Sequence, residues 1–438
     1  MLHLEVLSLD FHLCYRLSKI WIFQMAKSAK SKLPESVDIL IAGGGYVGLS
    51  CAVAIKDAAP HLSVMIVDPV PENAVENDER ASAIAADASQ MLNALGLWEG
   101  LVKNAQPINE MIVTDSKVSD VTRPVFLTFA NDTEEDQPFA HMVENRELVK
   151  ALRKKGDSDG IIRITENGVA SFETEVSHTS VTLNSGDIIS TKLLVACDGV
   201  RSRLRDMAGI QTVHWPYDQK GIVCTVEHER PHEGRAEEHF LPAGPFAILP
   251  LKGNRSSLVW TESSHDADRL LKQDEMIFET ELEQRFGYKL GDIKLASKVQ
   301  AFPLGLRLAR EFMRSRFVLA GDAAHGIHPI AGQGLNLGFK DAAALAQTIV
   351  EADRLGQDFG TVDVLERYQM WRRFDTVQMG VVTDVLNRLF SNDNGFLRAA
   401  RSFGLGVVDR MPAMKKYFIN QASGENTTAP KLLRGEAI

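Results

Sequence analysis

The chain has 438 residues, of which 45% are hydrophobic, so it can bury a large core and is long enough for two or three structural units. Its 58 aspartate and glutamate residues outnumber 48 lysine and arginine residues, which gives a net charge of -10. Because no long basic cluster is present that could neutralise a phosphate backbone, we expect no nucleic-acid partner.

The cysteines and the hydropathy pattern point to a reducing compartment. The four cysteines are far apart in the sequence and include no C-x-x-C pair, so we expect neither a disulfide framework nor a zinc site. They are Cys14, Cys51, Cys197 and Cys224. No uninterrupted apolar run of about 18 residues occurs, so no membrane-spanning helix is expected.

Residues 1–36 precede the first predicted strand. Residues 1–24 are apolar but are interrupted by charges, which a signal peptide would not carry within its apolar core. We interpret this segment as a wrongly assigned upstream extension or a disordered arm. An amphipathic membrane anchor is the alternative interpretation.

The first informative motif follows a short apolar strand at residues 37–42. It has the pattern G-x-G-x-x-G, and a helix rich in small residues follows at residues 49–59. In this pattern the first glycine permits a tight turn, the second lets a pyrophosphate approach the backbone, and the third lets helix and strand pack closely. The three glycines are Gly43, Gly45 and Gly48.

A second predicted strand, at residues 63–67, ends at Asp68. An acidic residue about 20 positions beyond the last glycine can bind a ribose hydroxyl in dinucleotide-binding proteins. The strand, helix and acidic residue supply the context that the glycine pattern requires, so residues 37–68 predict dinucleotide binding. A glycine-rich turn with no ligand is the alternative.

Between residues 81 and 155 the pattern predicts two helices with a strand between them. We predict a helix over residues 81–100 with Arg80 at its start, a strand at 125–129, and a helix over 146–155 that begins with Arg146. Both arginines could equally be solvated surface residues.

Residues 161–196 predict short strands, with a hairpin turn at 184–187 and a buried strand at 192–196. Asp198 and Gly199 follow that strand, and a dipeptide of this kind is by itself a common turn. Residues 211–301 then predict a mostly antiparallel sheet with one helix at 274–286, inserted between parts of the nucleotide-binding region.

The last third contains another glycine-punctuated segment after an apolar strand at residues 316–320. It predicts a cofactor clamp that leads into a helix at 342–349, because it combines one carboxylate with a glycine-rich helix start. Its chemistry-bearing residues are Gly321, Asp322, Pro329, Gly332, Gly334, Leu335 and Asn336. From residue 340 to about 420 the pattern is helical, and residues 423–438 predict a disordered tail.

Three motifs in this order resemble the single-component flavoprotein aromatic hydroxylases, the para-hydroxybenzoate hydroxylase fold. The motifs are G-x-G-x-x-G at 43–48, Asp198-Gly199 with Ser202 and Arg205, and the segment 321–338. Shorter segments look most like the ubiquinone-biosynthesis hydroxylases within that group. They are residues 78–83, 144–148, 383–390, 404–406 and 409–412.

The resemblance implies an α/β fold, with a Rossmann-like FAD-binding domain, an inserted and mostly antiparallel β-sheet substrate domain, and a C-terminal helical region. We assign residues 37–210 and 302–350 to the FAD-binding domain, 211–301 to the substrate domain, 351–422 to the C-terminal helices and 423–438 to a tail.

The resemblance also implies roles for individual residues. Gly43, Gly45 and Gly48 would hold the FAD pyrophosphate, and Asp68 the adenosine ribose. Arg80 and Arg146 would reach the ribityl or phosphate region, and Asp322 the ribityl or pyrophosphate groups. The backbone amides of Gly334, Leu335 and Asn336 would face the flavin pyrimidine ring and stabilise its reduced anion. Asp198 and Gly199 are associated with both FAD and NAD(P)H in that family.

The chemistry implied is hydroxylation of the aromatic ring of a polyprenylated phenol in ubiquinone biosynthesis, with NAD(P)H and O2, through a flavin C4a-hydroperoxide. Such an enzyme needs no nucleophile–base pair, because the flavin carries the reactive atoms. We expect it to be cytoplasmic. A peripheral contact with the inner membrane or with a biosynthetic complex, and a homo-oligomer, are left open.

Three alternatives remain at this stage. The first is a hydroxylase of a small soluble aromatic acid on the same fold, and the second is a prenyl-binding protein of this architecture without catalysis. The third is a metal site at His325 and His328, which is disfavoured because no third ligand is evident nearby.

Overall fold

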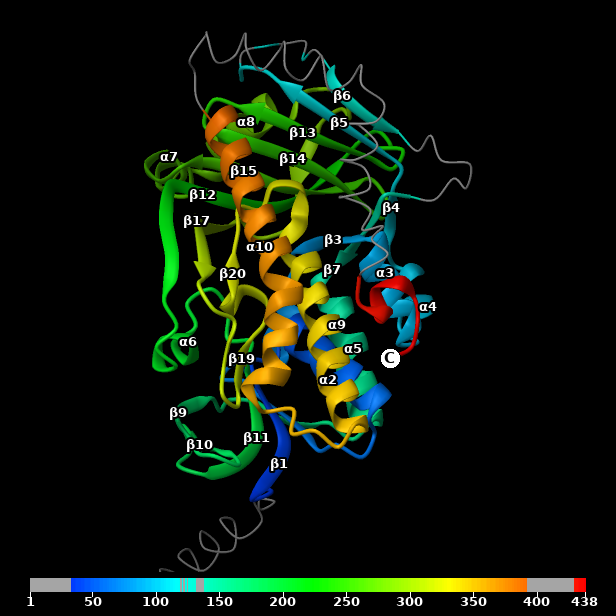
Figure 1. The fold of residues 1–438 in the computed structure, drawn as a ribbon. Helices are drawn as coiled ribbons and strands as arrows, with labels where there is room; N and C mark the ends of the chain where they lie inside the picture. The colour runs from blue at the N-terminus through cyan, green and yellow to red at the C-terminus, as the bar shows by residue number, and fades with distance from the viewer. Residues whose placement is uncertain (1–32, 119, 121–122, 124, 131–137, 392–428) are drawn as a thin grey trace, which may run out of the picture. The chain divides into compact units, whose positions relative to one another are not determined.

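The computed structural model describes residues 33–118, 120, 123, 125–130, 138–391 and 429–438. From Val37 onward the described residues form one compact unit. Figure 1 shows an α/β region that carries the first strand and a large sheet with its own helices. The predictions for residues 1–32, 404–406 and 409–412 fall outside the described residues.

The first sheet is built around the parallel pair β1 and β2, which runs in register from Ile39 with Val64 to Ala42 with Val67. Its strand order is β18-β19-β11-β1-β2-β8, and β8 and β19 are each parallel to their neighbours β2 and β11. The strands are β1 (Ser36–Ala42), β2 (Val64–Val67), β8 (Ile162–Ile164), β11 (Ile188–Ala196), β18 (Met313–Arg314) and β19 (Phe317–Leu319). The predicted turn at 184–187 is confirmed, because it joins β10 (Thr179–Leu183) to β11 in an antiparallel pair, and β9 (Val169–Thr174) pairs with β10.

Helix α2 (Tyr46–Ala58) packs against both α5 (Asn145–Ser158) and α9 (Gln333–Arg354) (Figure 1). Small residues allow this close packing. Gly48 and Ala52 of α2 are buried, as is the alanine-rich stretch of α9 from Ala342 to Ala346. The helices therefore bring the glycine motif at 43–48 next to the start of α9.

The second sheet has nine strands in the order β20-β17-β12-β15-β14-β13-β5-β6, with β16 also paired to β12. Every pair is antiparallel except β13 with β5, which is parallel from Arg235 with Glu110 to Phe240 with Asp115. Its strands are β5 (Glu110–Asp115), β6 (Val125–Ala130), β12 (Thr212–His228), β13 (Arg235–Leu241), β14 (Gly244–Leu251), β15 (Arg255–Ser263), β16 (Ile293–Leu295), β17 (Gln300–Ala309) and β20 (His325–Gly326). The sheet thus extends beyond residues 211–301, because β5 and β6 come from an earlier part of the chain.

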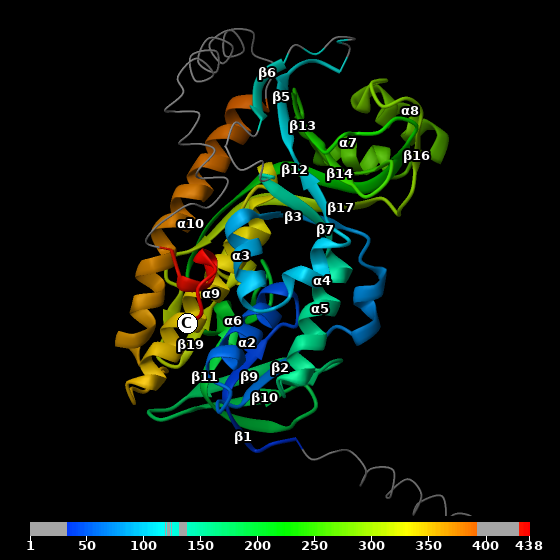
Figure 2. The ribbon, with the colours of Figure 1, turned by 90° about the vertical axis from the view of Figure 1, so that its right-hand side faces the viewer.

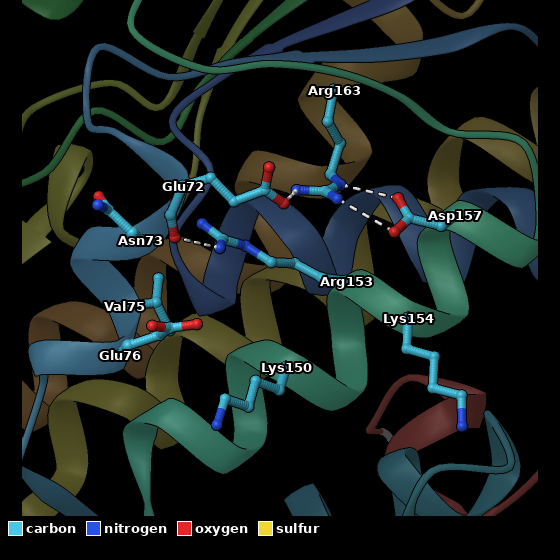
Figure 3. Close-up of a pocket in the computed structure, with 9 residues that line it drawn as sticks. All are labelled: Glu72, Asn73, Val75, Glu76, Lys150, Arg153, Lys154, Asp157 and Arg163. Atoms are coloured by element: carbon cyan, nitrogen blue, oxygen red, sulfur yellow. Dashed lines mark hydrogen bonds and ion pairs between the residues drawn. The ribbon is translucent and has the colours of Figure 1, made fainter.

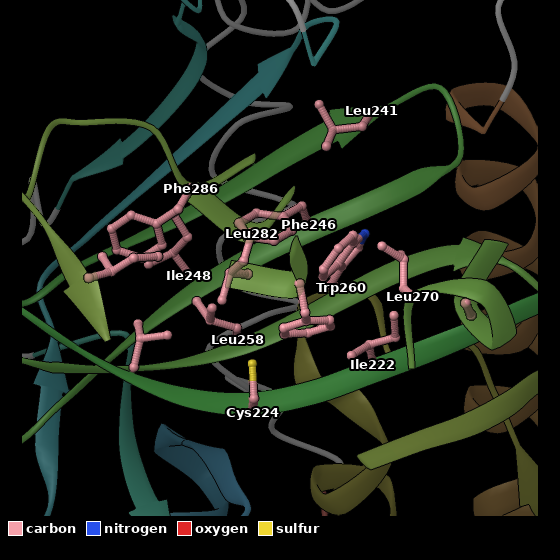
Figure 4. Packing of buried hydrophobic residues seen from close by; sticks show 14 of the residues in the cluster. Ile222, Cys224, Leu241, Phe246, Ile248, Leu258, Trp260, Leu270, Leu282 and Phe286 are labelled. Atoms are coloured by element: carbon pink, nitrogen blue, oxygen red, sulfur yellow. The ribbon is translucent and has the colours of Figure 1, made fainter. Parts of the chain in front are cut away.

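One face of this sheet carries an apolar core that is covered by α7 (Ser264–Leu270) and α8 (Glu275–Phe286). Ile222, Trp260 and Phe246 stand opposite one another on β12, β15 and β14, so their side chains share this face. Figure 4 shows them packed with Leu282 of α8. Helix α8 confirms the helix predicted at 274–286.

A small third sheet, with β7 (Ala140–Glu144) between β3 (Ala81–Ala85) and β4 (Gln106–Ile108), packs against the opposite face. The predicted helix at 81–100 is therefore wrong over its first five residues. Residues from Ala81 to Ala85 pair with β7 along their whole length, and this tertiary pairing overrides the helix preference of alanine. Two short helices follow, α3 (Ala86–Ala94) and α4 (Trp98–Val102).

The long helix α10 (Val362–Phe390) packs along α9 (Figures 1 and 2). The expected disorder of residues 423–438 is wrong for the part that is described. There η4 (Lys431–Arg434) contacts α3 and α9, and Leu432 and Leu433 are each only 2% exposed. Two adjacent leucines in a polar tail bury enough apolar surface to fix the segment.

The predicted fold class is confirmed as mixed α/β with a large, mostly antiparallel sheet and a helical C-terminal region. The boundaries of the individual domains remain a prediction. No helix among the described residues is long and apolar enough to cross a bilayer.

Candidate active site

The turn after β1 is possible only with glycines. Gly43 has a φ of 115°, and a Cβ atom there would overlap the carbonyl oxygen of Cys197. A Cβ on Gly48 would overlap the carbonyl oxygen of Gly43, so the first turn of α2 lies directly against the end of the strand. These two glycines hold strand and helix together, as their spacing predicts.

The remaining positions of this motif leave the helix start open. Gly45 is the N-cap of α2, has no side-chain cap, and has no atom within 4 Å of where its Cβ would lie. The Asp68 carboxylate accepts hydrogen bonds from the backbone N–H groups of Gly44, at 2.5 Å, and Val70, at 2.8 Å. The open backbone N–H groups at a helix N-terminus suit a phosphate group.

Val47 connects this motif to the glycine segment of the last third of the chain. A Cβ on Gly338 would lie 2.5 Å from Cγ2 of Val47, and a Cβ on Gly321 would lie 3.1 Å from both of its methyl groups. Gly321 also has a positive φ of 62°. The two motifs, far apart in sequence, therefore interlock around one valine side chain.

A buried charge network lies beneath Gly321. Asp341 of α9 accepts hydrogen bonds from the Gly321 N–H at 2.8 Å, His325 Nε2 at 2.6 Å and Arg372 Nε at 2.8 Å. Burial raises the pKa of Asp341, but the neighbouring His325 and Arg372 more than offset this, so its pKa lies below the usual value. No local sequence motif marks Asp341 or Arg372, and the pattern at His325 suggested only the disfavoured metal site.

Asp322 and Arg80 lie close enough to influence each other electrostatically. Asp322 has accessible surface, yet desolvation by the surrounding protein raises the pKa of its carboxyl group, Asp341 adds to the shift, and Arg80 opposes it. Arg80 forms a bidentate ion pair with Asp78 at 2.8 Å, and its guanidinium carbon lies 5.4 Å from the centre of the Phe302 ring. Burial, with Asp322 next, raises the pKa of Tyr46 to about 12.

The start of α9 is fixed by the side chain of Asn336, which is 2% exposed. Its Oδ1 accepts a hydrogen bond from Ala85 N–H, and its Nδ2 donates to the Ala83 carbonyl oxygen, both at 3.0 Å. The predicted role for Asn336 concerned its backbone only, so this anchoring of β3 is new. Gly334, like Gly45, has no atom within 4 Å of its Cβ position.

Residues at the ends of this segment define its path. Pro329 precedes η3 (Ile330–Gly332), and Gly332 takes a left-handed conformation with φ of 64° as the N-cap of α9. Leu335, in the first turn of α9, is 5% exposed. The predicted clamp is therefore a short turn followed at once by a helix N-terminus.

The Asp198-Gly199 motif reaches the same turn through Arg205. Gly199 has a φ of 82°, and Asp198 accepts a hydrogen bond from Leu204 N–H at 3.3 Å. The Arg205 side chain, 1% exposed, donates to the carbonyl oxygens of Ala323 at 3.0 Å and Val200 at 3.2 Å. The motif is thus joined to the residue that follows Asp322.

Arg146 follows Asn145, whose backbone N–H donates a 2.9 Å hydrogen bond to the carbonyl oxygen of Arg80. Arg146 forms an ion pair with Glu144, which also binds Arg255, and all three line a recess together with Glu79. The predicted contacts of Arg146 and of Arg80 with a cofactor both stay predictions.

A further recess, of about 500 Å³, lies between α5 and η1 (Glu72–Asn77) (Figure 3). Arg163 pairs there with Glu72 and Asp157, and Arg153 donates a hydrogen bond to the Glu72 carbonyl oxygen. Both arginines of this recess are therefore already bound to groups of the protein itself.

The metal alternative finds no support in geometry. Among the described residues, no three or more His, Cys, Asp and Glu side chains converge as metal ligands would. His325 instead binds Asp341, and His328 lies against Tyr217 with ring centres 5.5 Å apart.

A protein-family model described as "FAD binding domain" matches residues 36–374. The chain belongs to this FAD-binding family. It is 42% identical to ubiquinone hydroxylase UbiL of Rhodospirillum rubrum over 91% of this chain and 92% of that protein. It is 31% identical to 3-demethoxyubiquinol 3-hydroxylase of Escherichia coli, over 89% of this chain and 99% of that protein. It is 30% identical to human mitochondrial ubiquinone biosynthesis monooxygenase COQ6, over 88% and 92% of the two chains.

Solved structures share the fold at low sequence identity. The p-nitrophenol 4-monooxygenase PnpA of Pseudomonas putida DLL-E4 has a TM-score of 0.74 at 18% identity, covering 90% of this chain and all of that one. PqsL of P. aeruginosa, in complex with 2-aminobenzoylacetate, has a TM-score of 0.72 at 20% identity, covering 85% of this chain and all of that one.

The predicted enzyme class is confirmed by these findings: the protein is an FAD-dependent monooxygenase. The local geometry fits an FAD molecule. Two helix N-termini without side-chain caps, α2 and α9, carry glycines with open Cβ positions at Gly45 and Gly334, where phosphate or ring oxygens can approach backbone N–H groups.

Proposed function

We propose that the protein hydroxylates the aromatic ring of a polyprenylated phenol in ubiquinone biosynthesis. The main support for this function is the 42% sequence identity between this chain and a ubiquinone hydroxylase, which extends along nearly the whole of both chains. The interlocked glycine motifs support it, because the chain keeps the geometry that FAD-dependent chemistry requires.

We propose that the FAD pyrophosphate binds at the N-terminus of α2, at Gly43, Gly45 and Gly48, with Asp68 near the ribose. Arg80 and Asp322 would hold the ribityl and pyrophosphate region, since the two side chains already influence each other. Gly321, Pro329 and Gly332 would shape the turn, and the backbone of Gly334, Leu335 and Asn336 would face the ring. Asp198, Gly199 and Arg146 remain weaker members of this set.

Bound FAD would supply the redox chemistry, taking a hydride from NAD(P)H and activating O2. The chain would position the ring, exclude water and stabilise negative charge. The N-terminus of α9, with its aligned backbone N–H groups, is suited to stabilise an anion. Asn336 would keep this helix start against β3.

A polyprenyl tail is nearly insoluble in water, so we propose that the enzyme works at the surface of the inner membrane. Exposed apolar side chains at helical spacing support this. They run along α10 at Met370, Phe374, Val377, Val381 and Val385, between 41% and 73% exposed. An apolar stripe of this kind on a long helix can contact lipid or a partner protein.

Turnover by purified protein tests the function. The protein should carry about one FAD per chain and should oxidise NAD(P)H in step with hydroxylation of a short-tailed polyprenylated phenol, followed by mass spectrometry. Conversion of a small aromatic acid but of no prenylated phenol would replace the proposal, and a colourless protein without flavin would end it. In cells that lack the gene, the quinone precursor that accumulates would identify the ring position.

Flotation with liposomes of anionic phospholipid tests the membrane contact. Wild-type protein should float with the liposomes, whereas the double variant Phe374→Ser/Val381→Ser should not. A wild-type dimer that this variant converts to monomer, with no flotation, would assign the stripe to a homo-oligomer instead.

A further inference from the structure

His328 is a buried polar group without a partner. Its side chain is 0% exposed, and neither Nδ1 nor Nε2 has a hydrogen-bond partner among the described residues. An unsatisfied buried polar atom destabilises the folded state, so such groups usually serve a purpose that the folded chain alone does not explain.

The described neighbours of His328 come from β12 and α10, two distant parts of the chain. The Tyr217 ring of β12 lies 5.5 Å from the imidazole, at an angle of 56°. The charge of Asp384 of α10 acts on His328, and Asp384 in turn accepts hydrogen bonds from Trp215 and Arg388. Burial lowers the pKa of His328 to about 4, against the smaller opposite effect of Asp384, so the imidazole is neutral at physiological pH and keeps one free acceptor nitrogen.

His328 lies in the segment that joins the cofactor turn to the N-terminus of α9. It follows β20, the edge strand of the large sheet, which pairs with β17, and it precedes η3, which leads into α9. Asp322 precedes it in the same segment, and Gly332 follows it. The imidazole is therefore held where the cofactor turn meets the sheet on which the substrate would lie.

If the role of His328 were only structural, we would expect its ring to be hydrogen-bonded within the protein. His325 provides the comparison, because it is equally buried but gives Nε2 to Asp341 at 2.6 Å within a closed network. His214 and His232 also bind backbone carbonyl oxygens. His328 has no such bond, so packing alone does not explain a polar ring at this position.

We propose that His328 is a catalytic residue that accepts the hydrogen bond, and then the proton, of the ring hydroxyl group of the phenol substrate. This inference rests on the proposed function for the identity of the substrate. The oxygen transfer itself uses the O2 and NAD(P)H of that function, and His328 handles only a proton.

The proton balance is simple. When the new C–O bond forms, the O–O bond derived from O2 breaks, and the second oxygen leaves with the bonding electron pair and becomes water after it takes up a proton. The ring becomes electron-poor, so the O–H bond of the ring hydroxyl breaks and its proton passes to the free imidazole nitrogen. The ring carbon then releases its hydrogen as a proton to water and the ring regains aromaticity, while the imidazolium returns its proton to the same ring oxygen. A weak neutral base can do this because the hydroxyl becomes acidic only as the ring is attacked.

Two substitutions separate hydrogen bonding from proton transfer. His328→Gln keeps an acceptor oxygen but cannot take a proton, and His328→Leu removes both. We would compare the binding of 2-prenylphenol with that of its O-methyl ether by flavin fluorescence, and the rate of ring hydroxylation from pH 6 to pH 10. His265→Gln is the matched control, because His265 is 89% exposed.

The wild type should bind the phenol up to roughly tenfold more tightly than the ether, as one hydrogen bond allows. His328→Gln should keep this preference but lose about 100-fold in hydroxylation rate at pH 7, with recovery toward pH 10 as the substrate ionises in solution. His328→Leu should lose both the preference and the rate. Both should keep a full complement of FAD.

Three results would overturn the proposal. They are an unchanged rate and pH profile in His328→Gln, an unchanged preference for the phenol in His328→Leu, or a loss of FAD and of folded structure in both, which would make His328 structural. If the wild type does not oxidise the prenylated phenol, the proposed function fails, but the preference of wild type and His328→Leu for phenol over ether still decides the role of His328.

Discussion

Asp341 on α9 accepts a 2.8 Å hydrogen bond from the backbone N–H of Gly321, so the turn that carries Asp322 is fixed to the helix that follows it. The same carboxylate holds His325 and Arg372, and Arg372 comes from α10. One fully buried acid therefore connects three segments around the cofactor turn.

We expect Asp341→Ala to lower the free energy of unfolding by about 3–5 kcal/mol, because the buried Arg372 charge would lose its buried partner. Urea denaturation, with the FAD content of the purified variant, measures this. Asp375→Ala is the matched control: Asp375 pairs with the same arginine but its side chain is 46% exposed, so its loss should cost at most about 1 kcal/mol. Equal effects of the two variants would contradict the network.

The contact between Val47 and Gly338 allows a rescue experiment. Gly338→Ala should lower FAD occupancy and thermal stability, because the new Cβ would lie 2.5 Å from a Val47 methyl group, and Val47→Ala should restore much of both by removing that methyl group. Gly48→Ala should not be rescued, since its Cβ would overlap the backbone carbonyl oxygen of Gly43.

Gly100→Ala is the control for these substitutions. Its Cβ would have no neighbour within 4 Å, and Gly100 lies within α4, so the change should be neutral or stabilising by up to about 1 kcal/mol. Failure of Val47→Ala to help Gly338→Ala would mean that the two motifs do not interlock through this side chain.

Local pattern was enough to predict the glycine motif, its two strands and the approach of Asp68. Those features depend on a short stretch of chain, with glycines whose positions have a direct steric reason. The helix expected at 81–100 fails because the partner strand β7 lies far along the chain and cannot be read from residues 81–85. The same limit applies to Asp341, whose partner Arg372 is supplied by a later helix.

Side-chain roles proved harder to predict than backbone roles. Asn336 was expected to act through its backbone, and its side-chain amide also binds the β3 backbone at Ala83 and Ala85. Arg80 and Arg146 looked alike in sequence, each beside a predicted helix start, and the structure pairs each with the acid two residues before it, Asp78 and Glu144. Arg80 is also influenced by Asp322, which comes from a distant part of the chain and could not be assigned to it from local sequence.

Asp322→Ala should lose FAD or flavin-dependent turnover, because it removes the accessible carboxylate of the cofactor turn. Asp322→Asn should retain more FAD, since an amide oxygen can still accept a hydrogen bond. Flavin absorbance per chain and NAD(P)H oxidation measure the two effects. Asp268→Ala, at a surface pair with Lys220, is the control, and full FAD occupancy with normal turnover in Asp322→Ala would remove this residue from the site.

Glu238 allows a test of the electrostatics of the large sheet. It is 4% exposed on β13, its carboxyl group has no hydrogen-bond partner among the described residues, and burial raises its pKa to about 7. Between pH 4.5 and pH 7 the folded chain therefore holds a proton that the unfolded chain has released, so Glu238 makes stability fall as pH rises through this window. Glu238→Gln should remove the fall and be more stable than wild type at pH 8, by on the order of 3 kcal/mol.

The neighbouring Glu237 should behave in the opposite way, because its side chain lies on the other face of the strand. Burial raises its pKa, but the stronger effects of His239 and Lys289 bring it to about 2. The stabilisation from this carboxylate is present above pH 4.5 and is lost as pH falls toward 2, so Glu237→Gln should be less stable than wild type at pH 8. Urea denaturation of Glu237→Gln and Glu238→Gln at pH 5 and pH 8 measures the two changes in stability. Shifts of the same sign at pH 8 would show that local burial and charge do not control these two groups.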